Sequence, residues 1–183
     1  MKIKSLIFYK EQNSNFEDAH PIVELYGQPN IKFRARSEIL VVRGSEVYLS
    51  IKKRGLCSYN SKVGYDVAGG GWQENETPET TAVRESKEES RILAVNPQYV
   101  GDYIVKYNEP HPWVKENIPK DFQWRGYYTQ VFIGKYSGIY SGPIDERDQD
   151  ELIKTGKFFK INAVIDFMHP VHKDALTKYL DSL

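Results

Sequence analysis

The sequence predicts an α/β layered domain, in which a mixed β-sheet packs against one central helix and one terminal helix. Three observations support this class. Runs rich in β-branched and aromatic residues fill the first part of the chain, a Pro-started polar helix follows three consecutive glycines, and an amphipathic segment ends the chain. At 183 residues the chain is long enough for one complete core and short for two, so we expect a single domain over residues 1–183.

Residues 1–30 form an N-terminal extension. Lys2–Lys10 and Pro21–Tyr26 are predicted to be short strands, because apolar residues alternate in the first and turn residues follow the second. The extension is therefore either a hairpin added to the sheet or a strand arm that joins two copies in a homodimer.

The clearest hairpin consists of Ile31–Val42 and Glu46–Lys52, with a tight turn at Gly44–Ser45. Arg34 and Arg36 share one face of its first strand, because side chains on a strand alternate with a period of two. They are either solvated charges at an edge or a pair that reaches a substrate phosphate from the sheet surface.

A short strand over Tyr65–Ala68 is expected to enter a loop of three glycines, and a helix follows that loop. Thr77 is a suitable N-cap, Pro78 suits the first helical position, and Glu79 lies near the positive end of the helix. We expect this helix to end at about Ser90.

The second half of the chain alternates strands with polar or Pro-containing loops, and it ends in a helix with an apolar face. The expected strands are Val95–Lys106, Tyr127–Lys135 and Lys157–Ile161, and a turn or bulge is expected at Gly101 in the first of them. The expected loops are Glu109–Phe122 and Ser137–Asp150. A helical turn is expected over Ala163–Met168, and the terminal helix over Val171–Leu183.

Composition excludes several classes of function. Lys and Arg together number 25, as do Asp and Glu, so no net field favours a nucleic-acid partner. The chain has no apolar stretch long enough to span a membrane. Cys57 is the single cysteine, which prevents an internal disulfide and fits a cytoplasmic location.

Three carboxylates share one face of the predicted central helix. Glu85, Glu88 and Glu89 are spaced i, i+3 and i+4, so they repel one another. Only Ala82 and Val83 offer apolar packing after the first turn, so burial does not explain this composition. A hard divalent cation would turn the repulsion into binding energy; the alternative is a solvated acidic face.

Glycine and polar residues around these carboxylates follow a longer pattern. It consists of Gly70, five residues, Glu76, seven residues, Arg84 and Glu85, two residues, and Glu88 and Glu89. This pattern, over Gly70–Ile92, resembles the box of the Nudix (MutT-like) hydrolases, and the wider resemblance covers about residues 31–183. It implies a Nudix-type α/β/α sandwich with a mixed sheet, one box helix and a C-terminal helix.

The resemblance also implies roles for these residues. The implied metal ligands are Glu85, Glu88 and Glu89, with the carbonyl of Gly70 as a further candidate. One of the three carboxylates would also act as the general base. Arg84 and Glu76 would orient the helix and the loop before it, and Mg²⁺, for which Mn²⁺ may substitute, would be the cofactor.

Two positions of the box depart from the family. Ser86 stands where an apolar residue is usual, which weakens a core contact. Arg91 stands where glycine usually eases the turn out of the helix, so the chain is expected to be free to leave by another path.

Carboxylates outside the box are candidates for a further base or metal ligand, or else belong to a solvated acidic loop. These candidates are Glu146 and Glu151, ranked first, followed by Asp145, Asp148 and Asp150.

Aromatic and basic residues of the Pro-containing loop and the following strand are candidates for a substrate wall. An exposed Trp in a polar loop would provide a platform for a base, although packing of the loop onto the domain explains the same residues equally well. The candidates for stacking are His111, Trp113, Trp124, Tyr127 and Tyr128, and those for phosphate or ribose are Arg125 and Lys115. His169 and His172, without a third clustered ligand, favour capping and packing of the terminal helix over metal binding.

The resemblance therefore implies Mg²⁺-dependent hydrolysis of the pyrophosphate link in a nucleoside diphosphate joined to another group. The small-molecule substrate would be of the nucleoside triphosphate, ADP-ribose or nucleotide-sugar type. The alternative is a catalytically weak Nudix-fold module that binds or senses a nucleotide, and Arg91 is the feature that favours it.

Overall fold

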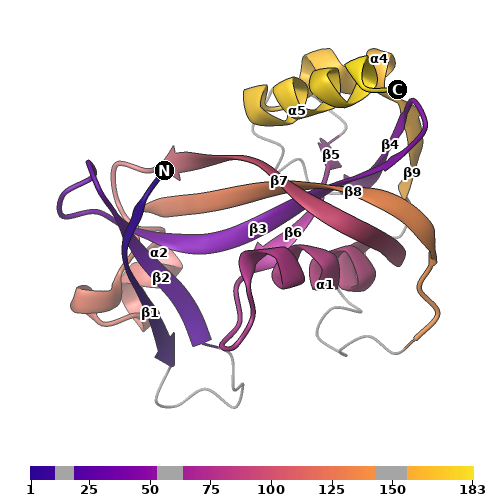
Figure 1. Cartoon of the computed structure of the whole chain (residues 1–183). Helices are drawn as coiled ribbons and strands as arrows, with labels where there is room; N and C mark the ends of the chain where they lie inside the picture. The colour runs from indigo at the N-terminus through magenta and orange to yellow at the C-terminus, as the bar shows by residue number, and fades with distance from the viewer. Residues whose placement is uncertain (11–18, 53–63, 143–155) are drawn as a thin grey trace.

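The computed structural model describes residues 1–10, 19–52, 64–142 and 156–183 (Figure 1). One mixed sheet contains the strands β1 Ile3–Lys10, β2 Ala19–Leu25, β3 Lys32–Arg43, β4 Glu46–Lys52, β5 Gly64–Asp66, β6 Ala68–Gly71, β7 Ile92–Lys106, β8 Gly126–Ile139 and β9 Gly156–Lys160. The helices are α1 Pro78–Ser90, α2 Pro112–Asn117, α4 Ile161–Val164 and α5 Pro170–Asp181, with 3₁₀ turns at Lys120–Phe122 and Ile165–Phe167.

The N-terminal strands extend the sheet. β1 pairs antiparallel with β2, and β2 pairs antiparallel with β3. In the described part of residues 1–30, the extension is therefore an added hairpin, which was one of the two alternatives.

β3 lies at the centre of the sheet, between β8, with which it runs parallel, and β6, with which it runs antiparallel. The glycines, expected in a loop, instead form β6: Gly69, Gly70 and Gly71 lie opposite Glu38, Ser37 and Arg36. β4 pairs with β3 only at the predicted tight turn. The glycines therefore bring three residues without side chains beside β3, shortly before α1.

The two faces of the sheet carry different helices (Figure 1). Consecutive residues of β3 show this: Ile39 packs in one core cluster with Ala82 of α1, and Leu40 packs in another with Leu176 of α5. The predicted α/β/α sandwich, with a box helix and a C-terminal helix, is confirmed.

The second half of the chain differs from prediction in detail. The loop expected over Glu109–Phe122 contains α2 and a 3₁₀ turn, because His111 caps a Pro-started segment. β7 begins at Ile92, β8 runs on to Ile139, and the pairing of β7 with β8 shifts register between Tyr99 and Gly101, which confirms a bulge there. Within the described residues, no helix is both long and apolar enough to cross a membrane.

Candidate active site

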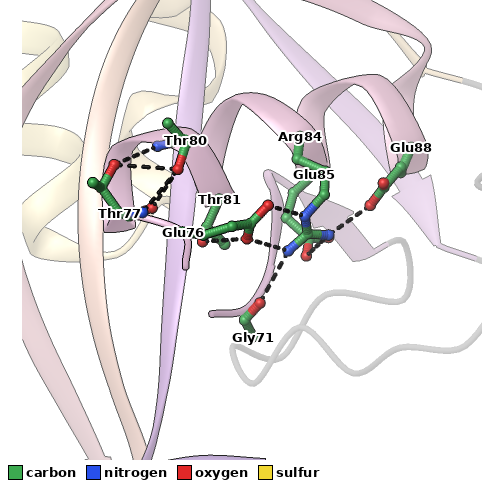
Figure 2. Close-up of polar contacts among 8 residues, drawn as sticks. All are labelled: Gly71, Glu76, Thr77, Thr80, Thr81, Arg84, Glu85 and Glu88. Carbon is green, nitrogen blue, oxygen red and sulfur yellow. Dashed lines mark hydrogen bonds and ion pairs between the residues drawn. The ribbon is translucent and has the colours of Figure 1, made fainter. Parts of the chain in front are cut away.

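The N-terminus of α1 is capped as predicted. Thr77 is the N-cap, and its Oγ1 accepts a hydrogen bond from the backbone N–H of Thr80 at 3.1 Å (Figure 2). Thr80 Oγ1 in turn accepts one from the backbone N–H of Thr77 at 2.9 Å, while Pro78 and Glu79 open the first turn. These bonds fix where α1 begins, and therefore which way its carboxylates project.

Arg84 is at the centre of the polar contacts of α1 (Figure 2). Its Nε donates to Glu76 Oε1 at 2.8 Å, and its Nη2 donates to Glu76 Oε2 at 3.2 Å and to the Gly71 carbonyl at 3.1 Å. Its Nη1 donates to Glu85 Oε1 at 2.8 Å and to Glu88 Oε2 at 2.6 Å. One guanidinium thus joins three carboxylates to the glycine strand.

Glu76 supports Arg84 from the loop before the helix. Its Oε2 also accepts a hydrogen bond from Thr81 Oγ1 at 2.8 Å. Burial alone would raise the pKa of Glu76, but the hydrogen bonds from Arg84 and Thr81 hold that pKa below its usual range. Glu76 is therefore ionised at neutral pH and is bonded to Arg84 through both of its carboxylate oxygens.

Glu85 lies against Gly70. A Cβ atom built on Gly70 would lie 2.2 Å from Glu85 Oε1, so only glycine lets this carboxylate lie across β6. Burial raises the pKa of Glu85 to about 7; the charges of Glu89 and Glu88 push it in the same direction, whereas Arg84 opposes them. The buried carboxylate lacks enough positive charge around it.

Glu89 completes the carboxylate face, and its Oε2 accepts the backbone N–H of Gly69 at 2.9 Å. Among the described residues, no three Asp, Glu, His or Cys side chains are grouped closely enough to hold a metal ion as they stand. Arg84 holds Glu85 and Glu88 instead. The donor set nevertheless fits a hard divalent cation, because it is made of carboxylate oxygens that repel one another; burial, with the charges of Glu89 and Glu88, raises the pKa of Glu85.

The exit from α1 keeps its tight turn although Arg91 replaces a glycine. Arg91 has φ 56° and ψ 27°, the left-handed conformation, and its N–H bonds to the carbonyls of Lys87 and Ser86. The expectation of another path was therefore wrong. Ser86 is fully buried, and its Oγ donates to the Ile92 carbonyl at 2.8 Å, which ties the helix to β7.

Arg34 and Arg36 lie on the face of β3 that also carries α5. Arg36 Nη2 donates to the Gly69 carbonyl at 2.9 Å, and its guanidinium carbon is 5.5 Å from the ring centre of Tyr127. The guanidinium carbon of Arg34 is 6.0 Å from the ring centre of Trp124. The structure therefore brings both arginines and Tyr127 together beside the glycine strand.

The two tryptophans differ. Trp124 is only 5% exposed, in a cluster with Ile22, Val114 and Ile118, so the expected exposed ring is buried and the packing alternative describes it. Trp113 is 43% exposed, and its ring centre is 5.7 Å from that of His20.

The remaining basic and acidic candidates lie elsewhere. Arg125 donates from Nη1 to the Asn108 carbonyl at 3.2 Å, and Lys115 pairs with Glu109. Glu146 and Glu151, with Asp145, Asp148 and Asp150, lie outside the described residues, as does Cys57.

Sequence reasoning missed Glu38. This glutamate of β3 is 5% exposed, and it is bonded by Tyr103 of β7 and His172 of α5. His169 caps α5, as expected, and stacks on Tyr103 with ring centres 4.0 Å apart. The available signal was an acidic residue directly before the apolar run Ile39–Val42 of β3.

Comparison with known proteins identifies the family of the chain. The model of the NUDIX domain matches residues 30–179. A NUDIX hydrolase from Nitrosomonas europaea superposes with a TM-score of 0.54 at 14% identity, covering 81% of this chain and 88% of that one. The E. coli ORF135 protein gives a TM-score of 0.48 at 14% identity, covering 80% and 88%. No curated protein sequence gives a match.

The matched region spans β3 to α5 and so includes the glycine strand, Arg84 and the three carboxylates of α1. Members of this family generally use a divalent metal and act on nucleoside diphosphates linked to another group. With this family match over most of its length, the chain belongs to the Nudix family and is a pyrophosphohydrolase.

Proposed function

We propose that this enzyme uses Mg²⁺, which Mn²⁺ can replace, to hydrolyse the pyrophosphate link of a nucleoside triphosphate, ADP-ribose or nucleotide sugar. The observation that carries the proposal is the placement of Glu85 and Glu88 on one arginine, with Glu89 bonded to the glycine strand beside them. A packing role does not explain a carboxylate whose pKa is raised by burial and raised further by the charges of Glu89 and Glu88.

In this proposal, Glu85, Glu88 and Glu89 hold the metal, with the Gly70 carbonyl as a further ligand. When bound, the metal would neutralise phosphoryl oxygens and lower the pKa of a water molecule. One of the three carboxylates accepts the proton of that water. Arg84, held by Glu76, keeps the carboxylates on one side of α1.

Arg36 and Arg34 are positioned to bind the phosphate or ribose part of the substrate. Both lie next to β6: Arg36 contacts the Gly69 carbonyl, and Arg34 Nη2 lies 3.3 Å from the position that a Cβ of Gly71 would take. Arginine suits this role because its guanidinium can bind two phosphate oxygens at once.

Two of the predicted aromatic candidates, Tyr127 and Trp113, remain accessible to a base. Tyr127 lies under Arg36, and Trp113 is exposed at the start of α2. Trp124 is buried, so in this proposal it packs behind these residues and does not contact the base. Arg125 is directed toward Asn108, so we assign it no contact with the phosphates.

The left-handed turn at Arg91 supports the enzyme over the sensing module, because it preserves the helix exit that a glycine would give. We also infer that residues 1–183 form one domain that acts in the cytoplasm. A homodimer through β1, where Leu6 and Ile7 are 41% and 43% exposed, is compatible with this proposal, and light scattering tests it.

The test is a substrate panel assayed with purified protein and Mg²⁺. It contains nucleoside triphosphates, ADP-ribose, nucleotide sugars, dinucleoside polyphosphates and capped RNA, and products are separated by chromatography. We expect cleavage within the pyrophosphate link of at least one class, lost on chelation and restored by Mg²⁺ or Mn²⁺. Nucleotide binding without turnover of any class would instead support the sensing module.

A further inference from the structure

Glu38, Tyr103 and His172 form a closed polar network between the sheet and α5. Tyr103 OH donates to both oxygens of Glu38, at 3.0 and 2.9 Å, and His172 Nε2 lies 3.0 Å from Glu38 Oε2. Glu38 and His172 are 5% and 6% exposed. A carboxylate buried this deeply needs partners, and α5 supplies one of them.

Arg36 is the next residue on the same face of β3. Its Nη2 lies 3.7 Å from Glu38 Oε1 and donates to the Gly69 carbonyl, while its Nε is buried without a hydrogen-bond partner among the described residues. The side chain is still 27% exposed. Arg36 is therefore anchored on its inner side by Glu38 and Gly69, and it retains donor capacity for an anion.

Gly69 connects Arg36 to the carboxylates of α1. Its carbonyl accepts from Arg36, and its N–H donates to Glu89 Oε2 at 2.9 Å. Because the two contacts are made by the C=O and the N–H of one residue, a phosphate bound by Arg36 would lie beside the proposed metal ligands. The position of Arg36 then decides where the pyrophosphate sits relative to Glu89.

We propose that α5 is part of the substrate-binding machinery: His172 and Tyr103 hold Glu38, and Glu38 holds Arg36 in the position that binds a substrate phosphate. Arg36 is the binding residue in this arrangement, and the other three are positioning residues. The inference rests on the proposed function of the same site.

Removal of the His172 ring should free Glu38 to turn toward Arg36 or solvent, which changes the geometry of Arg36 without touching α1. For His172→Leu we expect KM to rise about tenfold, with kcat within roughly twofold of wild type. His172→Gln places an amide donor near the position of Nε2 and should restore KM. Tyr103→Phe removes one hydroxyl donor and should raise KM about threefold.

A matched variant separates positioning from loss of stability. Leu176→Ala removes a fully buried side chain of α5 that belongs to the apolar cluster and not to the network. It should lower the melting temperature at least as much as His172→Leu and leave KM unchanged, provided that assays are run well below the transition. Lys178→Gln, on the exposed side of α5, should change neither quantity.

The experiment combines steady-state kinetics with calorimetric binding of α,β-methylene ADP, a nucleoside diphosphate analogue whose bridge cannot be hydrolysed, in the presence of Mg²⁺. The dissociation constant should rise with KM in His172→Leu and Tyr103→Phe and return in His172→Gln. An unchanged dissociation constant in both variants, or an equal rise in Leu176→Ala, would overturn the role of α5.

The two proposals fail separately. Wild-type protein that binds the analogue but turns over no substrate would contradict hydrolysis, while the binding series still decides the role of α5. If His172→Leu does not fold, Tyr103→Phe decides it. Wild-type protein that turns over substrate with a KM insensitive to Arg36→Gln would overturn the inference and leave the hydrolase assignment in place.

Discussion

Glu85 and Glu38 are two buried glutamates on opposite faces of one sheet, and their environments shift their ionisation in opposite directions. Glu85 is 8% exposed and Glu38 is 5% exposed. Burial raises the pKa of Glu85 to about 7. At Glu38 burial acts in the same direction, but the hydrogen bond from His172, the charge of Arg36 and the hydrogen bond from Tyr103 hold the pKa below its usual range.

The pKa values of Glu85 and Glu38 shift in opposite directions because their neighbouring charges and hydrogen-bond donors differ, since the two side chains are buried to a similar depth. Glu85 shares Arg84 with Glu76 and Glu88, and Glu89 adds another negative charge. Glu38 is surrounded by donors. A carboxylate group with surplus negative charge is suited to bind a cation, whereas one that is fully bonded is suited to hold other residues in place.

The largest expected effect is a loss of turnover when a carboxylate of α1 is replaced. Glu88→Gln or Glu89→Gln should lower kcat by roughly 10²- to 10⁴-fold, the range for loss of a general base, and loss of metal can add to it. The measurement is kcat on the best substrate of the panel at saturating Mg²⁺.

The control for these variants is Glu79→Gln, which removes an exposed carboxylate from the first turn of the same helix. It should retain activity within roughly twofold, because surface substitutions change little. Full activity in both Glu88→Gln and Glu89→Gln would remove the catalytic assignment of α1.

The second prediction concerns folding stability without metal. Glu38→Gln should lower the free energy of unfolding by about 4 kcal/mol, because it leaves the buried part of Arg36 without its counter-charge and weakens two hydrogen bonds. Urea denaturation in the presence of a chelator measures this change. A loss below about 1 kcal/mol would show that the network around Glu38 is no firmer than an exposed ion pair.

The third prediction is a pH dependence of folding stability that arises from Glu85. Between pH 4.5 and about 7, the carboxyl of Glu85 has lost its proton in the unfolded chain but retains it in the folded one. Unfolding therefore releases a proton, and the stability of the metal-free protein falls as pH rises through this window, by up to about 3 kcal/mol from this group.

Glu85→Gln removes this dependence, so the variant should gain stability relative to wild type as pH rises from 4.5 to about 7. Glu116→Gln, an exposed change on α2, should show a constant difference. A constant difference for Glu85→Gln as well would mean that its carboxyl ionises at its ordinary pKa. Added Mg²⁺ should reverse the trend, because metal binding requires the ionised form.

The two sites also differ in how far the sequence predicted them. The carboxylates of α1 follow from local geometry, since helical spacing alone places Glu85, Glu88 and Glu89 on one face. His172 and Glu38 are 134 residues apart, and they meet only because α5 docks on the sheet. No pattern within either segment contains that contact.

Other misses have the same cause. The composition of the loop around Trp124 did not show that Ile22 and α2 would cover its ring. The glycines were expected in a loop but form a strand, because their pairing with β3 is decided by the whole sheet. The fold class, the capped start of α1 and the terminal helix were predictable, since each depends on periodicity or on end signals within one segment.

The smallest effect concerns the end of α1, which helps to fix where Glu88 and Glu89 project. Arg91 holds a left-handed conformation that costs a side-chain-bearing residue about 1 kcal/mol relative to glycine. Arg91→Gly also loses the hydrogen bond from Nη1 to the Gly142 carbonyl, so Arg91→Ala is the matched reference, because both variants lose that bond. The free energy of unfolding of Arg91→Gly should be about 1 kcal/mol higher than that of Arg91→Ala, and kcat should be equal in both variants.

If Arg91→Ala were the more stable variant, the left-handed turn would not be what holds this end of the helix. The projection of Glu88 and Glu89 would then depend on Ser86 and its hydrogen bond to the Ile92 carbonyl.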